Sequence, residues 1–170
     1  ENVRSVDGRA GYRPAKPKAP EIDSDVTGRE LDSTTSRQLR ALESRNAATV
    51  AKHLVMTGRY LELDPQFALE HAVAASRSAG RISAVREAVG VAAYVAEDYE
   101  LALRELRTHR RISGSLDHLA LLVDCERALN RISKALDMIE EAKREELPAP
   151  VRVELAIVES GIYADQGKKS

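Results

Sequence analysis

From about residue 36 onwards, apolar residues recur at intervals of three and four, the spacing of one face of an α-helix. The pattern predicts a short helix around 36–42 and a longer one over 46–63. A third helix begins at Pro65, since proline is well tolerated in the first helical turn, and ends at Gly80. The first half of the chain is therefore expected to be helical.

The second half repeats this organisation. Residues 84–114 contain two helical patterns joined by a short acidic turn at 97–99. Helices are expected next over 116–128 and 133–143, and a final helix over 151–164 follows two prolines. Helical patterns thus extend over the apolar part of the chain, which predicts an all-α fold.

Gly90 lies in the middle of the first helix of the 84–114 segment. A glycine inside a helix costs about 1 kcal/mol relative to alanine, so its presence calls for a reason. The usual reason is close approach of another helix. We expect Gly90 to pack against the following helix, which carries Ala102 and Leu106 on one side.

An internal repeat connects the helix pairs. Ala68, Ala102 and Ala135 each lie just inside the second helix of a pair, separated by 34 and 33 residues. This period resembles the tetratricopeptide repeat (TPR), a helix pair of about 34 residues. The resemblance implies a TPR-like right-handed stack of about three antiparallel helix pairs, with a leading short helix and a C-terminal capping helix.

The repeat is imperfect. Met56 and Val123 occupy the positions equivalent to Gly90, and His109 occupies a position that is normally small and is filled by Ala75 and Ala142 in the other pairs. A generic antiparallel helical bundle therefore remains an alternative.

Four phrases carry a closer resemblance: DVTGRELD (25–32), VAKHLV (50–55), VREAVGVAAY (85–94) and DCERALNR (124–131). They resemble a group of small TPR-like proteins from high-GC Gram-positive bacteria, which often have a charged N-terminal arm. The resemblance covers roughly 25–167. It implies an intracellular TPR fold, and the group has no established activity.

Composition agrees with packed helices. Hydrophobic residues make up 43% of the chain but aromatic residues only 4%, so the core must be built from aliphatic side chains. The net charge of −1 provides no overall field to attract nucleic acid or a membrane, and no run reaches the ~18 apolar residues of a membrane span. The single cysteine, Cys125, fits a reducing compartment, and we expect a cytoplasmic location.

The chain divides into an arm, 1–24, and a helical repeat domain, 25–170. The arm has little apolar content, five Lys or Arg through Pro20, and prolines at positions 14, 17 and 20, so we expect it to be disordered with polyproline II character. It is either a solvated linker or a docking arm.

No catalytic pattern is found. No two of the four histidines are four residues apart, as a zinc site on one helix face requires, and there is no nucleophile-elbow or phosphate-binding glycine motif. Cys125 is expected to be a packed small residue. We therefore predict a protein that is not an enzyme and uses no cofactor or metal.

Two surfaces are candidate binding sites. In a TPR-like stack the first helix of each pair lines a groove, which predicts a non-catalytic adaptor that binds a protein or peptide partner. The expected groove residues are His53, Thr57, Tyr60, Glu87, Val91, Tyr94, Asp124 and Arg127. Their mixed charge disfavours a clamp for a C-terminal carboxylate and suits apolar anchors with hydrogen bonds.

The alternative function is an RNA- or phosphate-binding accessory protein. Its candidate patch consists of four arginines on the second helix of the middle pair, which together with the basic arm could contact phosphates: Arg104, Arg107, Arg110 and Arg111. The shortage of aromatic residues disfavours RNA, because single-stranded bases usually stack on aromatic rings.

Overall fold

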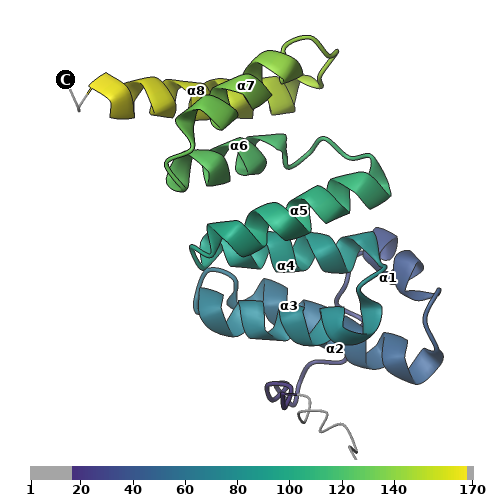
Figure 1. Ribbon diagram of the computed structural model, residues 1–170. Helices are drawn as coiled ribbons and strands as arrows, with labels where there is room; N and C mark the ends of the chain where they lie inside the picture. The colour runs from purple at the N-terminus through teal and green to yellow at the C-terminus, as the bar shows by residue number, and fades with distance from the viewer. Residues whose placement is uncertain (1–16, 168–170) are drawn as a thin grey trace, which may run out of the picture.

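The structure is a computed structural model that describes residues 17–167. In this range the chain forms eight α-helices and no strand, which confirms the all-α prediction. The helices are α1 (Ser33–Leu39), α2 (Ser44–Tyr60), α3 (Pro65–Ala79), α4 (Ser83–Val95), α5 (Tyr99–Ser113), α6 (Leu119–Ala128), α7 (Ile132–Ala142) and α8 (Ala149–Gly167). They form an array that runs from α2 and α3 at one end to α7 and α8 at the other (Figure 1).

Acidic side chains begin several of the helices. The carboxylates of Asp32, Glu43, Asp64 and Asp98 each accept backbone N–H groups of the first turn at 2.9–3.1 Å. Such N-caps satisfy donors that have no partner inside the helix. Because Asp32 and Glu43 act as caps, α1 and α2 begin earlier than the periodicity predicts.

Small residues allow the helices to pack closely. The three repeat alanines, Ala68, Ala102 and Ala135, are all 0% exposed. A Cβ atom placed on Gly90 would lie 2.6 Å from both Cγ and Cδ2 of Leu106 and 3.2 Å from its backbone nitrogen. The expected close approach of α4 and α5 at Gly90 is therefore confirmed.

The core consists of three clusters of buried residues that follow one another along the array. Val50, Leu54 and Val85 pack at the α1–α4 end, and Val89, Leu103 and Leu106 pack in the middle. Around α6, α7 and α8 the core consists of Val123, Ile139, Leu147, Val151, Leu155 and Ile162, among others. Each helix thus buries an aliphatic stripe against its neighbours in the chain.

Two inter-helix turns share one backbone geometry. Glu97, between α4 and α5, and Asn130, between α6 and α7, have φ of 63° and 59°, in the left-handed region. In both turns the N–H of the next residue donates to the carbonyl five residues before it, at 2.8 Å. This is the capping pattern of a helix that ends in a left-handed residue. Glu97 and Asn130 are 33 positions apart, the same offset that separates Ala102 from Ala135, so the repeat is also seen in the backbone.

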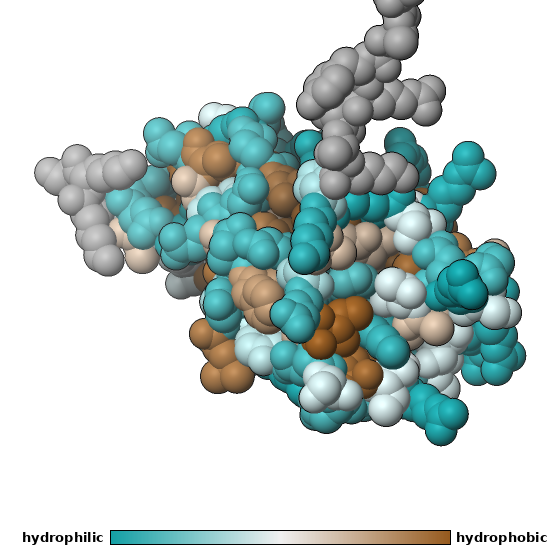
Figure 2. Space-filling view, turned by 90° about the horizontal axis from the view of Figure 1, so that it is seen from below, coloured by the Kyte–Doolittle hydropathy of each residue, from teal (hydrophilic) through white to brown (hydrophobic). Residues whose placement is uncertain are grey.

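The segment before α1 packs on the helices. Arg59 of α2 donates to the carboxylates of Asp23 (3.0 Å) and Asp25 (2.8 and 2.9 Å), and Arg77 of α3 donates to the carbonyl of Pro17 (3.0 Å). Residues 17–24 of the expected arm thus contact α2 and α3, and residues 1–16 lie outside the described part of the chain. The face at this end of the array has hydrophobic residues interspersed among hydrophilic ones (Figure 2).

Helix α8 ends the array. Its buried residues include Val151, Leu155 and Ile162, which recur at intervals of four and seven and so lie on one side of the helix. Val153 and Ile157 are 59% and 67% exposed, so the solvent side of α8 is not uniformly polar. Among residues 17–167, no helix combines the length and the apolar character that crossing a membrane requires.

Candidate functional site

Two apolar hollows lie on the side of the array formed by the first helix of each pair. The first, of about 240 Å³, lies between α1, α2 and α4. It is lined by Leu31, Thr35, Leu54, Thr57, Gly58, Leu61, Ala84, Glu87, Ala88 and Val91. The second, of about 190 Å³, lies between α4, α6 and α8. It is lined by Tyr94, Ala120, Leu121, Asp124, Glu154, Ile157 and Val158.

Helix α4 connects the two hollows. Glu87 and Val91 line the first hollow, and Tyr94 lines the second. These three residues follow one another at intervals of four and three, so they form a single stripe on α4. We call the two hollows and this stripe the groove. Its three charged lining residues, Glu87, Asp124 and Glu154, are all acidic.

The predicted groove residues of α2 occupy different positions. His53 is only 4% exposed and does not line the groove, which corrects the prediction. Its Nδ1 lies 2.9 Å from Nδ1 of His71 on α3. Thr57 lines the first hollow but is largely buried, and its hydroxyl donates to the carbonyl of His53 (2.9 Å). The hydroxyl of Tyr60 donates to Asp23 (2.8 Å), so the chain itself engages this residue.

The buried imidazoles of His53 and His71 are not both protonated. In a contact between two Nδ1 atoms one nitrogen must donate and the other must accept, so at least one ring is neutral. Burial lowers the pKa of His53 to about 4 and also lowers the pKa of His71. Both histidines therefore contribute to packing in their uncharged form.

At the other end of the groove, hydrogen bonds connect α4, α6 and α8. The hydroxyl of Tyr94 donates to Asp124 at 2.6 Å, and Arg127 donates to Asp124 (3.1 Å) and to Asp165 on α8 (2.7 Å). Burial and the bond to Asp124 raise the pKa of Tyr94. The structure thus brings Tyr94, Asp124 and Arg127 together in one network beside the second hollow.

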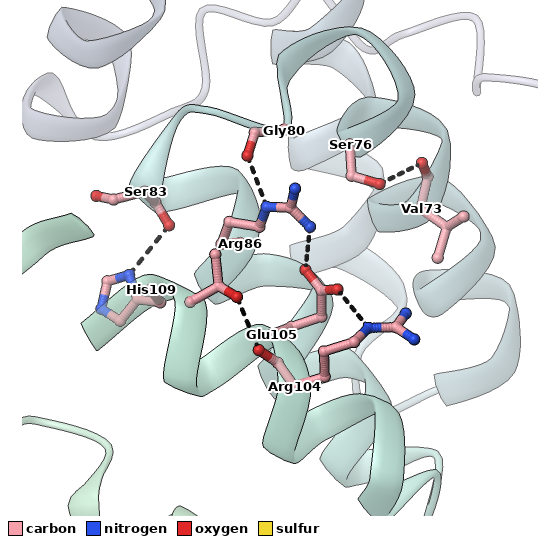
Figure 3. Close-up of polar contacts among 9 residues, drawn as sticks. Val73, Ser76, Gly80, Ser83, Arg86, Arg104, Glu105 and His109 are labelled. Carbon is pink, nitrogen blue, oxygen red and sulfur yellow. Dashed lines mark hydrogen bonds and ion pairs between the residues drawn. The ribbon is translucent and has the colours of Figure 1, made fainter. Parts of the chain in front are cut away.

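The arginine patch is partly engaged in ion pairs. Glu105, only 4% exposed, accepts from Arg86 (2.7 Å) and from Arg104 (3.2 Å), as Figure 3 shows. Glu126 of α6, 1% exposed, accepts from Arg107 at 2.6 Å. Two of the four predicted phosphate contacts therefore neutralise buried carboxylates.

The other two arginines differ from these. In the described part of the chain, no ion pair or hydrogen bond involves the guanidinium groups of Arg110 and Arg111. The surface beside Arg104 and Arg107 is a depression of about 620 Å³ that also contains Asp98 and Glu100. The surroundings of the patch are therefore of mixed sign, which weakens its attraction for phosphate.

Three potential metal ligands meet near the start of α4. One ligand-type atom from each of Glu87, His109 and His118 lies within 4.8 Å of the other two. Nε2 of His118 is 2.5 Å from Oε1 of Glu87, and this contact lowers the pKa of Glu87 and raises that of His118. Nδ1 of His109 lies 3.0 Å from the carbonyl of Ser83 (Figure 3). The search for pairs of histidines on one helix missed this cluster, because its members come from three elements.

Cys125 is 0% exposed, and burial raises the pKa of its thiol to about 12. A thiol that stays protonated at neutral pH is a poor nucleophile. The packed role expected for Cys125 is consistent with this environment.

The chain was also compared with known proteins. No family model, curated protein or solved structure matches it.

Proposed function

We propose that the protein is a TPR-like adaptor without catalytic activity, and that it binds a segment of a partner protein in the groove. Three features support a TPR-like stack of about three helix pairs with α8 as the terminal helix. The repeat alanines are fully buried, Gly90 allows α4 to touch Leu106, and the α4–α5 and α6–α7 turns share one geometry. A cytoplasmic location belongs to the same proposal and agrees with a single, buried thiol.

The observation that carries the proposal is the stripe on α4 that joins two apolar hollows. An interacting peptide gains most from a few large side chains that fill pockets. Each aliphatic side chain buried in this way contributes about 1.5–3 kcal/mol before the cost of ordering the peptide. Two such anchors supply about 3–6 kcal/mol, so contacts of the partner's flanking residues with the groove are needed as well.

The charges of the groove indicate the chemistry of the partner. Glu87, Asp124 and Glu154 give the groove an acidic lining. An acidic lining favours a partner with Lys or Arg beside its apolar anchors and repels acidic segments. We therefore propose an amphipathic segment with two aliphatic anchors and flanking basic residues.

Selection from a displayed peptide library tests this proposal. The enriched peptides are expected to combine aliphatic anchors with Lys or Arg. Helix α8 provides matched variants, because Ile157 lines the second hollow and Val153 does not, while both are exposed. Ile157→Asp should weaken binding of a selected peptide at least tenfold, and Val153→Asp should leave it nearly unchanged. Equal effects of the two substitutions, or enrichment of acidic peptides, would contradict the proposal.

The RNA- or phosphate-binding alternative has weaker support. Arg104 and Arg107 neutralise buried glutamates. Using them for phosphates would leave Glu105 with Arg86 alone and Glu126 with only Arg131, at 3.5 Å. Only Arg110 and Arg111 of the patch have guanidinium groups without a partner in residues 17–167. Two contacts supply little of the affinity that nucleic-acid binding requires.

A further inference from the structure

His109 departs from the repeat in a way that changes its surroundings. The equivalent residues of the other pairs, Ala75 and Ala142, are small and buried. His109 is also buried, at 6% exposure, but it is a polar ring at a helix-packing position. Its ring packs edge to face against that of His118, with centroids 5.6 Å apart.

The backbone fixes the orientation of this ring. A carbonyl oxygen can only accept a hydrogen bond, so the contact with Ser83 requires the proton of a neutral His109 to be on Nδ1. The lone pair is then on Nε2. A hydrogen bond from one ring nitrogen to a carbonyl is how proteins commonly orient a histidine that binds a metal through the other.

We propose that Glu87, His109 and His118 form a binding site for a first-row divalent cation, with Zn²⁺ as the best-suited ion. Two imidazoles and one carboxylate are ligands that Zn²⁺ prefers. Three protein ligands leave a coordination position open for water or for a group of a bound partner. The ion would connect α4, α5 and the segment that leads into α6.

The adjustment needed to hold the ion is small. With ligand bonds of about 2.0–2.1 Å and tetrahedral angles, ligand atoms lie about 3.3 Å apart. The 2.5 Å contact between Glu87 and His118 must therefore open by less than 1 Å, and all three ligand atoms already lie within 4.8 Å of one another. The side chains of Glu87 and His118 are 40% and 21% exposed, so these two can move without disturbing the core.

Nearby charges favour a cation. Besides the three ligands, Asp117 beside His118 and Glu154 of α8 interact electrostatically with His118, and Asp32 interacts with Glu87. All three are acidic. They lower the cost of bringing a divalent cation to the cluster.

Titration of the tag-free full chain with Zn²⁺ and with Co²⁺ tests the proposal. We expect one ion per chain, a higher melting temperature in the presence of Zn²⁺, and a Co²⁺ absorption spectrum of a four- or five-coordinate site. His118→Gln and Glu87→Gln each remove one ligand at a partly exposed position and should weaken Zn²⁺ binding at least tenfold. Asp117→Asn, which removes a neighbouring acid but no ligand, should retain most of the affinity.

Two results would overturn the proposal. One is a Co²⁺ spectrum of the parent chain like that of the aqueous ion, which would show that no inner-sphere protein site forms. The other is unchanged Zn²⁺ affinity in both His118→Gln and Glu87→Gln, which would show that the ion binds elsewhere. Both measurements use folded protein, because neither substituted residue belongs to the core.

Discussion

Substitution of Gly90 by alanine tests the close contact between α4 and α5. The added Cβ would lie 2.6 Å from two side-chain atoms of Leu106 and 3.2 Å from its backbone nitrogen. Favourable carbon–carbon contacts lie at about 3.5–4.0 Å, so α4 and α5 must separate or Leu106 must leave its rotamer. Leu106 is 1% exposed and surrounded by core residues, which leaves it little room to move.

The magnitude follows from two opposing effects. Alanine gains about 1 kcal/mol over glycine in a helix interior, and overpacking a core costs about 1–3 kcal/mol. Gly58 is a matched control, because it lies in α2 and a Cβ there would meet nothing within 4 Å. Gly58→Ala should therefore stabilise the protein by about 1 kcal/mol, and Gly90→Ala should be about 1–3 kcal/mol less stable than Gly58→Ala.

Chemical denaturation of the parent and the two variants measures this difference. A double-mutant cycle adds a second criterion, because Leu106→Ala should cost less in the Gly90→Ala background than in the parent, where about 2–5 kcal/mol is expected. Equal stabilisation by the two alanines would refute the argument that Gly90 exists to let α5 approach α4.

Two further predictions concern buried charge. NMR titration of the imidazole resonances should give His53 a pKa of about 4, against 6.5 in the unfolded chain. Between these two values the unfolded chain binds more protons than the folded protein. The stability contributed by neutral His53 is therefore complete above pH 6.5 and is lost as the pH falls towards 4. A pKa near 6.5 in the folded protein would show that the His53–His71 contact is not buried. Arg107→Gln should lower the free energy of unfolding by about 1–3 kcal/mol, because the buried carboxylate of Glu126 then has only Arg131 nearby, at 3.5 Å. Arg111→Gln, the control, should change the free energy of unfolding by less than about 0.5 kcal/mol. Equal denaturation curves for the two arginine variants would show that Arg107 does not stabilise the fold through Glu126, and Arg107 would again be a candidate phosphate contact.

The helices could be predicted from local patterns, and so could the close contact of α4 with α5. Apolar periodicity located every helix, and the cost of Gly90 in a helix pointed to its contact with the α5 helix that carries Leu106. The helix starts were less accurate, because Glu43 caps α2 and the periodicity does not register a capping glutamate. Helix formation depends on residues within a few positions of one another, and the cost of a glycine inside a helix is local too, which is why the sequence reveals both.

The site was harder to predict, because it depends on contacts between distant residues. His53 was expected in the groove, and only the position of His71, 18 residues away, explains why it is buried. The α5 arginines were predicted as one patch, but the pairing of Arg104 and Arg107 with buried Glu105 and Glu126 was not predicted. The Glu87–His109–His118 cluster left one signal in the sequence, a histidine where the repeat has alanine. That signal indicates an unusual position and does not identify the other two residues.

The central claim is that the stripe on α4 and the two hollows form the binding surface. The most direct measurement is an NMR titration of the labelled protein with a selected aliphatic and basic peptide, following the backbone amides. We predict the largest shifts at Val91 and Tyr94 of α4 and around Ile157 of α8, with small shifts on the arginine-bearing face of α5. Shifts concentrated at Arg104, Arg107 and Arg111, with the α4 stripe unaffected, would contradict it.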